Sequence, residues 1–80
     1  MSPMAANVAP APGPHPVRVA RANFGFTQES LAVAVGVTRQ TIISIESGDY
    51  APSVILAIRI ARCVEKSVEE LWGPAADALG

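Results

Sequence analysis

The sequence is poor in the residue types that small secreted proteins and metalloproteins require. Its 80 residues include one cysteine and one histidine, which excludes an internal disulfide and a Cys/His metal cluster. Aromatic residues make up 5% of the chain and charged residues 16%. No segment has the roughly 18 apolar residues of a membrane span, and the first residues lack the basic and apolar regions of a signal peptide. We therefore expect a reduced, cytoplasmic protein without a cofactor or a membrane partner.

An excess of positive charge is also missing. Six Lys/Arg and seven Asp/Glu give a net charge of −1 and a pI near 5.6. Because most of the affinity for duplex DNA comes from neutralised phosphates, a DNA-binding protein of this composition must gather its few cations on one face. The low total predicts weak non-specific binding to nucleic acid.

The chain is long enough for one domain, and half of its residues are hydrophobic. Residues 1–16 hold five of the seven prolines, which predicts a disordered Pro/Ala-rich arm in which His15 is solvated. Residues 17–72 carry the periodic apolar pattern of a folded domain. Gly73-Pro74 is expected to close its last helix, leaving residues 73–80 as a short tail.

Apolar residues recur at helical spacing in five segments of that domain. The predicted helices span residues 17–23, 28–35, 39–47, 54–64 and 68–72. Thr27, Thr38 and Ser53 stand at the N-cap positions of three of them, and Ser67 with Glu70 fits a capping box before the last. The side chains expected to face the core from the first three helices are Val17, Ala20, Phe24, Leu31, Ala32, Val35, Ile42 and Ile45. These elements, without any strand pattern, predict an all-α bundle of five helices.

The most informative stretch is Phe26–Gly48. Its two helices, separated by a turn at Gly36, have the arrangement of a helix-turn-helix. The first turn and a half of the second helix carries polar side chains, and this part of such a helix enters the major groove. Arg39 pairs with guanine and Gln40 with adenine in the usual major-groove contacts. For Ile43, contact with a thymine methyl and incidental exposure are equally compatible with the sequence.

The order and spacing of these motifs resemble the Cro/lambda-repressor-type helix-turn-helix proteins, the XRE family, over residues 17–72. The matching segments are G-F-T-Q at Gly25–Gln28, L-A-x-x-x-G-V at Leu31–Val37, T-R-Q-T-I at Thr38–Ile42, I-E-S-G at Ile45–Gly48, Y-x-P-S at Tyr50–Ser53, I-A-R at Ile60–Arg62 and S-V-E-E-L-W at Ser67–Trp72. The resemblance implies a five-helix, lambda-repressor-like fold. It also implies a sequence-specific transcriptional regulator that binds a near-palindromic operator in double-stranded DNA as a homodimer.

The resemblance also assigns roles to residues of the two helices. Base contacts fall to Arg39, Gln40 and Ser44, with Ile43 beside them, and a structural ion pair is implied between Arg21 and Glu46. Phosphate contacts are expected from Gln28, Thr27, Thr38, Thr41, Arg18 and Ser47. A helix N-terminus such as that of the segment beginning at Gln28 favours a phosphate, because its free N–H groups and dipole attract negative charge. For Thr27 and Thr38, capping is the stronger expectation, and both roles are compatible.

Three positions depart from the family pattern. Asp49 stands where a Lys or Arg is usual, and Phe24 occupies a position that is commonly basic. Both changes remove positive charge near the expected DNA face, so we expect a shallow dependence of affinity on salt. Glu65 stands where a glycine often ends the fourth helix.

Dimerisation is expected through the last helix and the C-terminal part of the helix before it, because both are more apolar than a small monomer requires. The interface is assigned to Val68, Leu71 and Trp72, although Trp72 also fits the core. The alternative function is a protein-interaction module, an antitoxin or a co-regulator, that keeps the fold and binds DNA weakly. No Ser/His/Asp or Cys/His arrangement supports an enzyme, and no small-molecule ligand is expected. A DNA-bound regulator of this kind would be nucleoid-associated.

Overall fold

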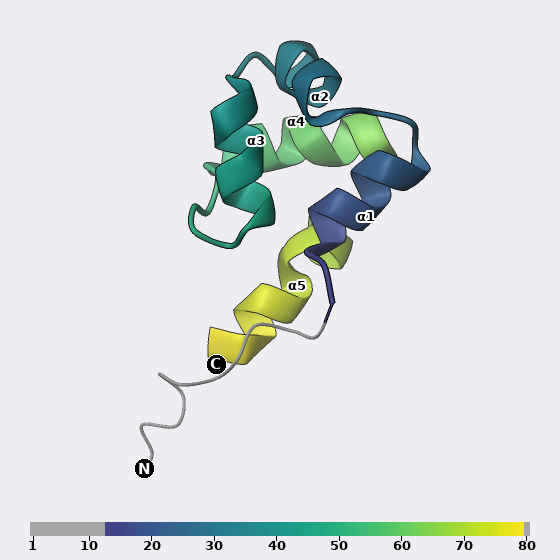
Figure 1. Ribbon diagram of the computed structural model, residues 1–80. Helices are drawn as coiled ribbons and strands as arrows, with labels where there is room; N and C mark the ends of the chain where they lie inside the picture. The colour runs from purple at the N-terminus through teal and green to yellow at the C-terminus, as the bar shows by residue number, and fades with distance from the viewer. Residues whose placement is uncertain (1–12, 80) are drawn as a thin grey trace.

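Five helices follow one another between residues 13 and 79, the part of the chain that the computed structural model describes. They are α1 (Pro16–Asn23), α2 (Gln28–Val35), α3 (Arg39–Glu46), α4 (Val54–Val64) and α5 (Val68–Leu79). In Figure 1, α2 and α5 lie at opposite ends of the molecule, with α1 and α3 on either side between them. No strand occurs within these residues, so the predicted all-α fold is confirmed.

Short polar side chains start the helices where the sequence predicts them. The hydroxyls of Thr27, Thr38 and Ser53 each accept a hydrogen bond from a backbone N–H in the first turn of α2, α3 and α4, at 2.9, 3.2 and 3.1 Å. Each such cap is worth about 1 kcal/mol. Between α2 and α3, Gly36 adopts a left-handed conformation with φ of 80°, a region that glycine enters without the steric cost of a Cβ. The helix-turn-helix is therefore shaped by local chemistry.

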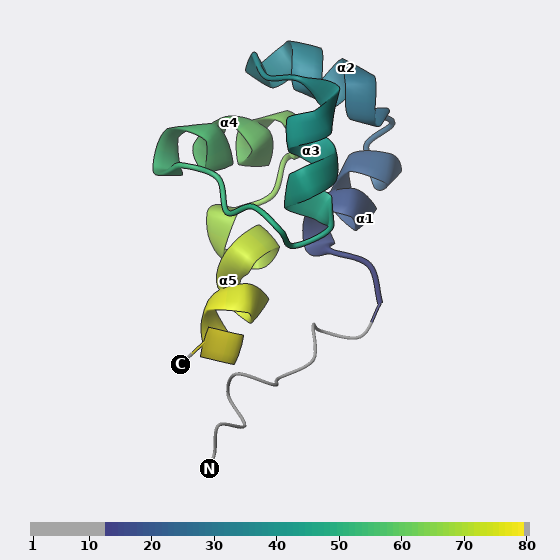
Figure 2. The same ribbon diagram turned by 60° about the vertical axis from the view of Figure 1, so that its left-hand side comes forward.

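The core lies where all five helices meet. Its largest fully buried side chains are Val17, Leu31, Ile42, Ile45, Ile60 and Leu71. Ala32 of α2 is 1% exposed, so its predicted inward position is confirmed, and α2 and α3 pack against each other. No helix covers α3 on the side that faces the viewer in Figure 2. One face of α3 is therefore anchored in the core while the other is open.

Phe24 does not join the core, contrary to the predicted apolar stripe on the first helix. Its side chain is 47% exposed, and its ring stacks on that of Phe26 at a centroid distance of 5.9 Å. Phe24 is the C-cap residue of α1, so the chain is already leaving the helix there. The stripe thus ends at Ala20.

The last helix is longer than predicted, because α5 continues through Gly73 and Pro74 to Leu79. Proline inside a helix removes one backbone hydrogen bond and crowds the carbonyl four residues earlier, which is why the Gly-Pro pair predicts an end. The residues that follow, 75–79, are mostly alanine and leucine, which have high helix propensity. The predicted tail is therefore helical as far as Leu79.

The folded domain also begins earlier than predicted. Pro16 is the first residue of α1, and His15 caps that helix through its side chain and is only partly exposed. The prediction of a solvated His15 in a disordered arm is therefore wrong for this residue. Residues 1–12 of the predicted arm lie outside the described residues.

The fourth helix, α4, is apolar nearly all round, but only one side of it is buried. Ala57, Ile60, Ala61 and Val64 face the core, and Cys63 packs against the core from the edge as a small, partly buried side chain. At its start, Val54 and Ile55 are 73% and 63% exposed. Among the helices of residues 13–79, none is long and apolar enough to cross a membrane.

Candidate nucleic-acid interface

The open face of α3 carries the side chains predicted to read bases. Arg39 and Gln40 occupy the first two helical positions and are exposed, whereas Ile43 and Ser44 are partly buried one turn later. Ile42 and Ile45, on the opposite face, are at most 1% exposed. The buried face of α3 thus fixes the helix in the core, and its polar first turn is available to a partner.

Ser47 lies just beyond α3, which ends at Glu46, one residue earlier than predicted. The Ser47 hydroxyl lies 3.0 Å from the Ser44 carbonyl oxygen and 3.0 Å from a carboxylate oxygen of Asp49. Its hydrogen is therefore engaged within the chain. Its predicted contact with a phosphate stays a prediction.

The predicted ion pair between Arg21 and Glu46 is present and joins α1 to the end of α3. Arg21 Nε donates to Glu46 Oε2 at 2.5 Å, and Arg21 Nη1 donates to the Phe26 carbonyl at 2.8 Å. The two charged side chains are only 12% and 5% exposed. Because the pair is shielded from water, loss of either partner alone would leave an uncompensated charge in the domain, and this couples α1 to the end of α3.

Gln28 links this ion pair to the face that points outward. Its Nε2 donates to Glu46 Oε1 at 3.1 Å, and its Oε1 accepts from Arg39 Nη2 at 3.3 Å. Gln28 and Arg39 are each the first residue of a helix. The sequence predicts both as contact residues, but their contact with each other was missed. The one signal for this contact in the sequence is the pair of threonine caps, because Gln28 and Arg39 each directly follow a capping threonine.

Two of the three threonines predicted to contact phosphate, Thr27 and Thr38, are engaged as caps. Thr27 and Ser30 form a reciprocal capping box at the start of α2, and the Thr38 and Thr41 hydroxyls lie 3.1 Å apart at the start of α3. The predicted capping role of Thr27 and Thr38 is confirmed. A phosphate contact through the same hydroxyls stays a prediction.

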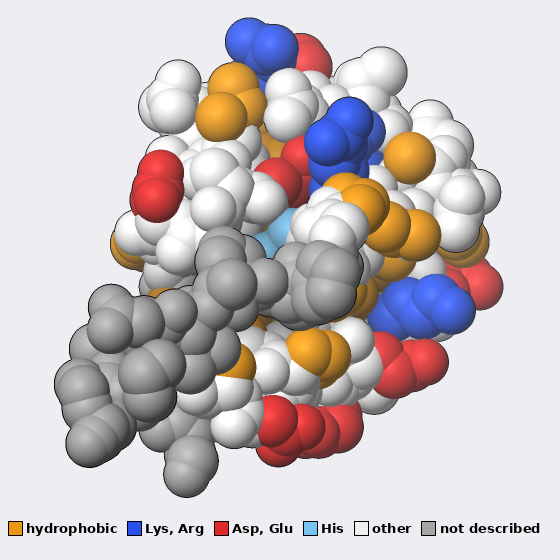
Figure 3. Space-filling view, turned by 60° about the horizontal axis from the view of Figure 1, so that its bottom comes forward, with side chains coloured by type: hydrophobic (Ala, Val, Ile, Leu, Met, Phe, Trp, Pro, Cys, Tyr) orange, Lys and Arg blue, Asp and Glu red, His pale blue; other side chains and the backbone are white. Residues whose placement is uncertain are grey.

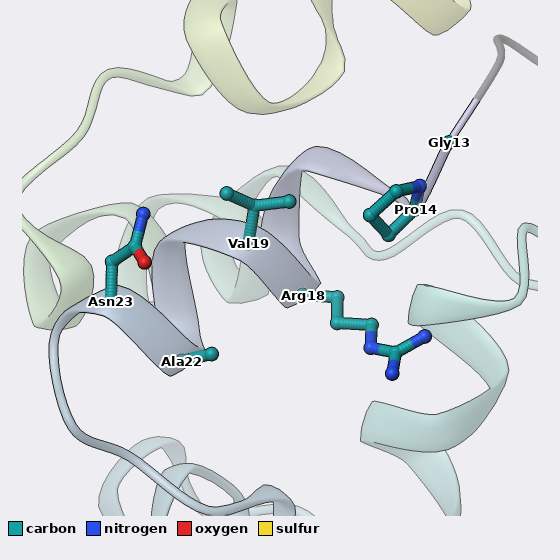
Figure 4. Close-up of a pocket in the computed structure, with 6 residues that line it drawn as sticks. All are labelled: Gly13, Pro14, Arg18, Val19, Ala22 and Asn23. Atoms are coloured by element: carbon teal, nitrogen blue, oxygen red, sulfur yellow. The ribbon is translucent and has the colours of Figure 1, made fainter.

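A concave region opens between α1, α2 and α3 beside these residues. It is lined by Arg18, Arg21, Gln28, Ile43, Glu46 and Ser47. Arg18 also borders a shallow hollow along α1, and in Figure 4 its side chain extends away from the helix while Val19 points to another side. Arg18 is exposed and is therefore placed to reach an anion in front of α1 and α3.

Positive charge is not concentrated around this region. On the face shown in Figure 3, Lys and Arg side chains occur in separate groups, and acidic side chains lie beside them. Arg21 is neutralised by Glu46, and Asp49 is exposed just after α3. Among the residues that line the concave region or stand on α3, the exposed cations are therefore Arg18 and Arg39.

The residues assigned to a dimer interface have different surroundings. Leu71 is 2% exposed and belongs to the core of the single chain, so its assignment to an exposed interface is wrong. Trp72 is partly buried and meets the His15 ring edge-on at a centroid distance of 6.4 Å. Val68 is 38% exposed. The C-terminal part of α4 is mostly buried, and the exposed apolar residues of α4 lie at its start.

Comparison with known proteins agrees with this geometry. The family model described as helix-turn-helix matches residues 17–71. The uncharacterised HTH-type transcriptional regulator YgzD of Bacillus subtilis is 46% identical over 56 residues, which cover 70% of this chain and 85% of that protein. An uncharacterised HTH-type transcriptional regulator of Methanothermobacter thermautotrophicus is 53% identical over 57 residues, covering 70% and 83%. No solved structure gives a significant match. The chain therefore belongs to the helix-turn-helix family of the Cro/lambda-repressor type, the DNA-binding transcriptional regulators.

Proposed function

We propose that the protein binds a near-palindromic operator as a homodimer, with α3 in the major groove of double-stranded DNA. The observation that carries this proposal is the exposed first turn of α3, where Arg39 is oriented by Gln28 and the helix is fixed by its buried face. Recognition helices of this class contact bases with their N-terminal residues. The first turn of α3 is therefore the reading element.

Arg39 and Gln40 are the principal base-reading residues of this proposal. A guanidinium can donate two hydrogen bonds to guanine, and a glutamine amide can pair with adenine, each worth about 1–3 kcal/mol of discrimination. Ser44 and Ile43 lie one turn further along and are partly buried. We assign them secondary contacts, Ser44 by hydrogen bonding and Ile43 against a thymine methyl.

Phosphate contacts surround this element. Gln28 Nε2 carries two hydrogens, of which the bond to Glu46 uses one, so the other can donate to a phosphate at the N-terminus of α2. Arg18, on α1, is the cation that we assign to a neighbouring phosphate. Thr27, Thr38, Thr41 and Ser47 complete the set of proposed backbone contacts.

The few exposed cations limit how many phosphates are neutralised. The slope of log affinity against log salt follows that number, so we expect a slope shallower than about −6. Binding isotherms measured between 50 and 200 mM salt, roughly the range in which such proteins lose most affinity, give the slope directly. A steeper slope would contradict this assignment of contacts.

The dimer would place its two recognition helices on successive turns of the groove. Half-sites then lie about 34–36 Å apart. Val68 and the exposed edge of Trp72 are the residues of α5 that we assign to the contact. Sedimentation at tens of micromolar tests this assembly, and a monomeric mass would contradict it.

The assignment of bases is tested by altering one reader at a time. After genomic footprinting has identified the bound sites, Arg39→Ala and Gln40→Ala are titrated against the site and against versions changed at each base. Arg39→Ala should lower affinity by about 10–100-fold and remove discrimination at one guanine. Arg62→Ala removes the same charge from an exposed position on α4 and serves as the matched control. Equal losses for all three variants, without a change in base preference, would refute the assignment.

A second function, docking to a larger protein, is favoured by one observation. Val54 and Ile55 are adjacent at the start of α4 and are 73% and 63% exposed, and contiguous exposed apolar side chains are a feature of protein–protein interaction sites. An antitoxin or co-regulator would fit this surface. A stable hetero-complex in a pull-down, lost in Ile55→Ser, together with no preference for any DNA site would favour this function over operator binding. Under the first proposal the protein is cytoplasmic and nucleoid-associated.

A further inference from the structure

His15 is the N-cap of α1, a position usually held by Ser, Thr, Asn or Asp. Its Nδ1 accepts a hydrogen bond from the Val17 N–H at 3.0 Å. Its carbonyl oxygen accepts from the N–H groups of Arg18 and Val19 at 2.9 and 3.2 Å. The backbone bonds would form with any residue at this position, whereas the side-chain bond needs an unprotonated ring nitrogen.

The same ring also contacts the far end of the chain. It meets the indole of Trp72 at a centroid distance of 6.4 Å and an interplanar angle of 63°, an edge-to-face arrangement that aromatic pairs favour. Trp72 lies on α5 and packs against the core. His15 therefore joins the start of α1 to α5.

We propose that His15 is a pH-sensitive cap, whose protonation releases the start of α1 from its capping bond. An imidazolium has hydrogens on both ring nitrogens and can only donate, so the bond from Val17 N–H is lost. It also places a positive charge at the N-terminus of a helix, where the dipole is unfavourable to cations. Both effects favour the neutral ring in the folded chain.

The surroundings of His15 also favour its neutral ring over the imidazolium. Burial lowers the pKa of His15 from its ordinary value of 6.5, and the carboxylate of Glu46 on α3 opposes this by a smaller amount. On α1, Arg21 already pairs with Glu46, which weakens the attraction of that carboxylate for an imidazolium. From α5, the indole of Trp72 carries no net charge, and the attraction of a ring face for a cation opposes the effect of burial.

These effects determine the direction of the response to acid. Because the folded-state pKa lies below the unfolded-state value, the unfolded chain binds the proton more readily. The stabilisation by neutral His15 is complete above pH 6.5 and is lost as the pH falls through and below that value. Since α1 carries Arg18 and Arg21, acid would loosen the helix that presents one proposed phosphate contact and holds one partner of the buried ion pair.

The test uses two features of the composition. The chain has one histidine and one tryptophan, so a single imidazole resonance in proton NMR reports the pKa of His15, and the fluorescence of Trp72 reports unfolding. The imidazole is titrated in the folded full-length chain and in urea. The urea midpoint is then measured between pH 7.5 and 5.5 for wild type and for His15→Ser, because serine caps a helix without titrating.

The proposal predicts a lower pKa in the folded chain than in urea. It also predicts a urea midpoint that falls with pH in wild type and changes less in His15→Ser. A folded-state pKa equal to or above the unfolded one, or the same pH dependence in both proteins, would overturn it. The NMR titration needs only wild type, so it decides the matter even if the variant folds poorly. Neither measurement involves DNA, and the result is independent of the proposed operator binding.

Discussion

The buried ion pair between Arg21 and Glu46 makes a quantitative prediction about the free energy of unfolding. Arg21→Met and Glu46→Gln each remove one charge and leave the other in a site where the side chains are only 12% and 5% exposed. Removing one partner of a fully buried pair costs about 3–5 kcal/mol. Because Arg21 keeps some contact with water and both replacements preserve much of the shape, we expect about 2–3 kcal/mol for each single change.

The double variant should lose less than the sum of the two single losses. With both charges gone, no unpaired charge is left buried, and neutral side chains of similar size often replace such a pair at little cost. We therefore expect a coupling energy of about 1–2 kcal/mol, within the usual range of roughly 0.5–3 kcal/mol for contacting residues. Gln28 loses one charged acceptor in Glu46→Gln but can still donate to the new amide oxygen.

Urea unfolding followed by the fluorescence of Trp72, the single tryptophan, measures these energies. For a small domain the free energy falls by about 1 kcal/mol per molar urea, so each single change should lower the midpoint by about 2–3 M. Arg62→Met, an exposed change on α4, should stay within about 0.5 kcal/mol of wild type. A coupling energy below about 0.5 kcal/mol would refute the view that this pair holds α3 in place.

Three further changes test the ends of the helices. Glu65 ends α4 in a left-handed conformation with φ of 57°, so Glu65→Gly should raise stability by about 0.5–1 kcal/mol, seen as a higher thermal midpoint, whereas Glu65→Ala should not. Thr38→Ala removes the cap of α3 and should cost about 1 kcal/mol in urea unfolding. Hydrogen bonds from Ser67 lower the pKa of Glu70 from 4.5, so its stabilisation is present above pH 4.5 and is lost as the pH falls through the lower folded-state value. Glu70→Gln should therefore show a weaker fall of the urea midpoint in acid, and an unchanged acid response would contradict this role.

The features predicted correctly from the sequence are those determined over a few residues. Thr27, Thr38 and Ser53 stand at N-cap positions, and each bonds a backbone N–H three residues later. Gly36 supplies the left-handed turn. The helix-turn-helix follows from these local signals together with the spacing of Ile42 and Ile45, which is why its position was predictable to within a residue.

The features that were missed depend on residues far apart or on competition between local rules. His15 and Trp72 are 57 positions apart in the sequence, and nothing near either residue indicates that their rings meet. The apolar character of its helix predicts Leu71 at an interface between chains, although the core of the single chain buries it. At Pro74 the local signal for a helix end is outweighed by the strong helix formers that follow.

The candidate site was predictable as a set of residues but not as a connected arrangement. The sequence predicts that Arg39 and Gln28 both contact DNA, whereas their mutual hydrogen bond and the link from Gln28 to Glu46 appear only in three dimensions. This connection matters because it couples a base-reading side chain to the buried ion pair. Gln28 and the buried Glu46 thus orient the exposed side chain of Arg39.

The most direct test of operator recognition is the ratio of affinities of the wild-type protein for its footprinted site and for random duplex at one fixed salt concentration. Fluorescence anisotropy with labelled duplexes, carried out near physiological ionic strength, gives both values. Specific binding by regulators of this kind exceeds non-specific binding by at least about 10³-fold, and we predict a ratio of that order. Equal affinities for the two duplexes would contradict the proposal that the first turn of α3 reads sequence.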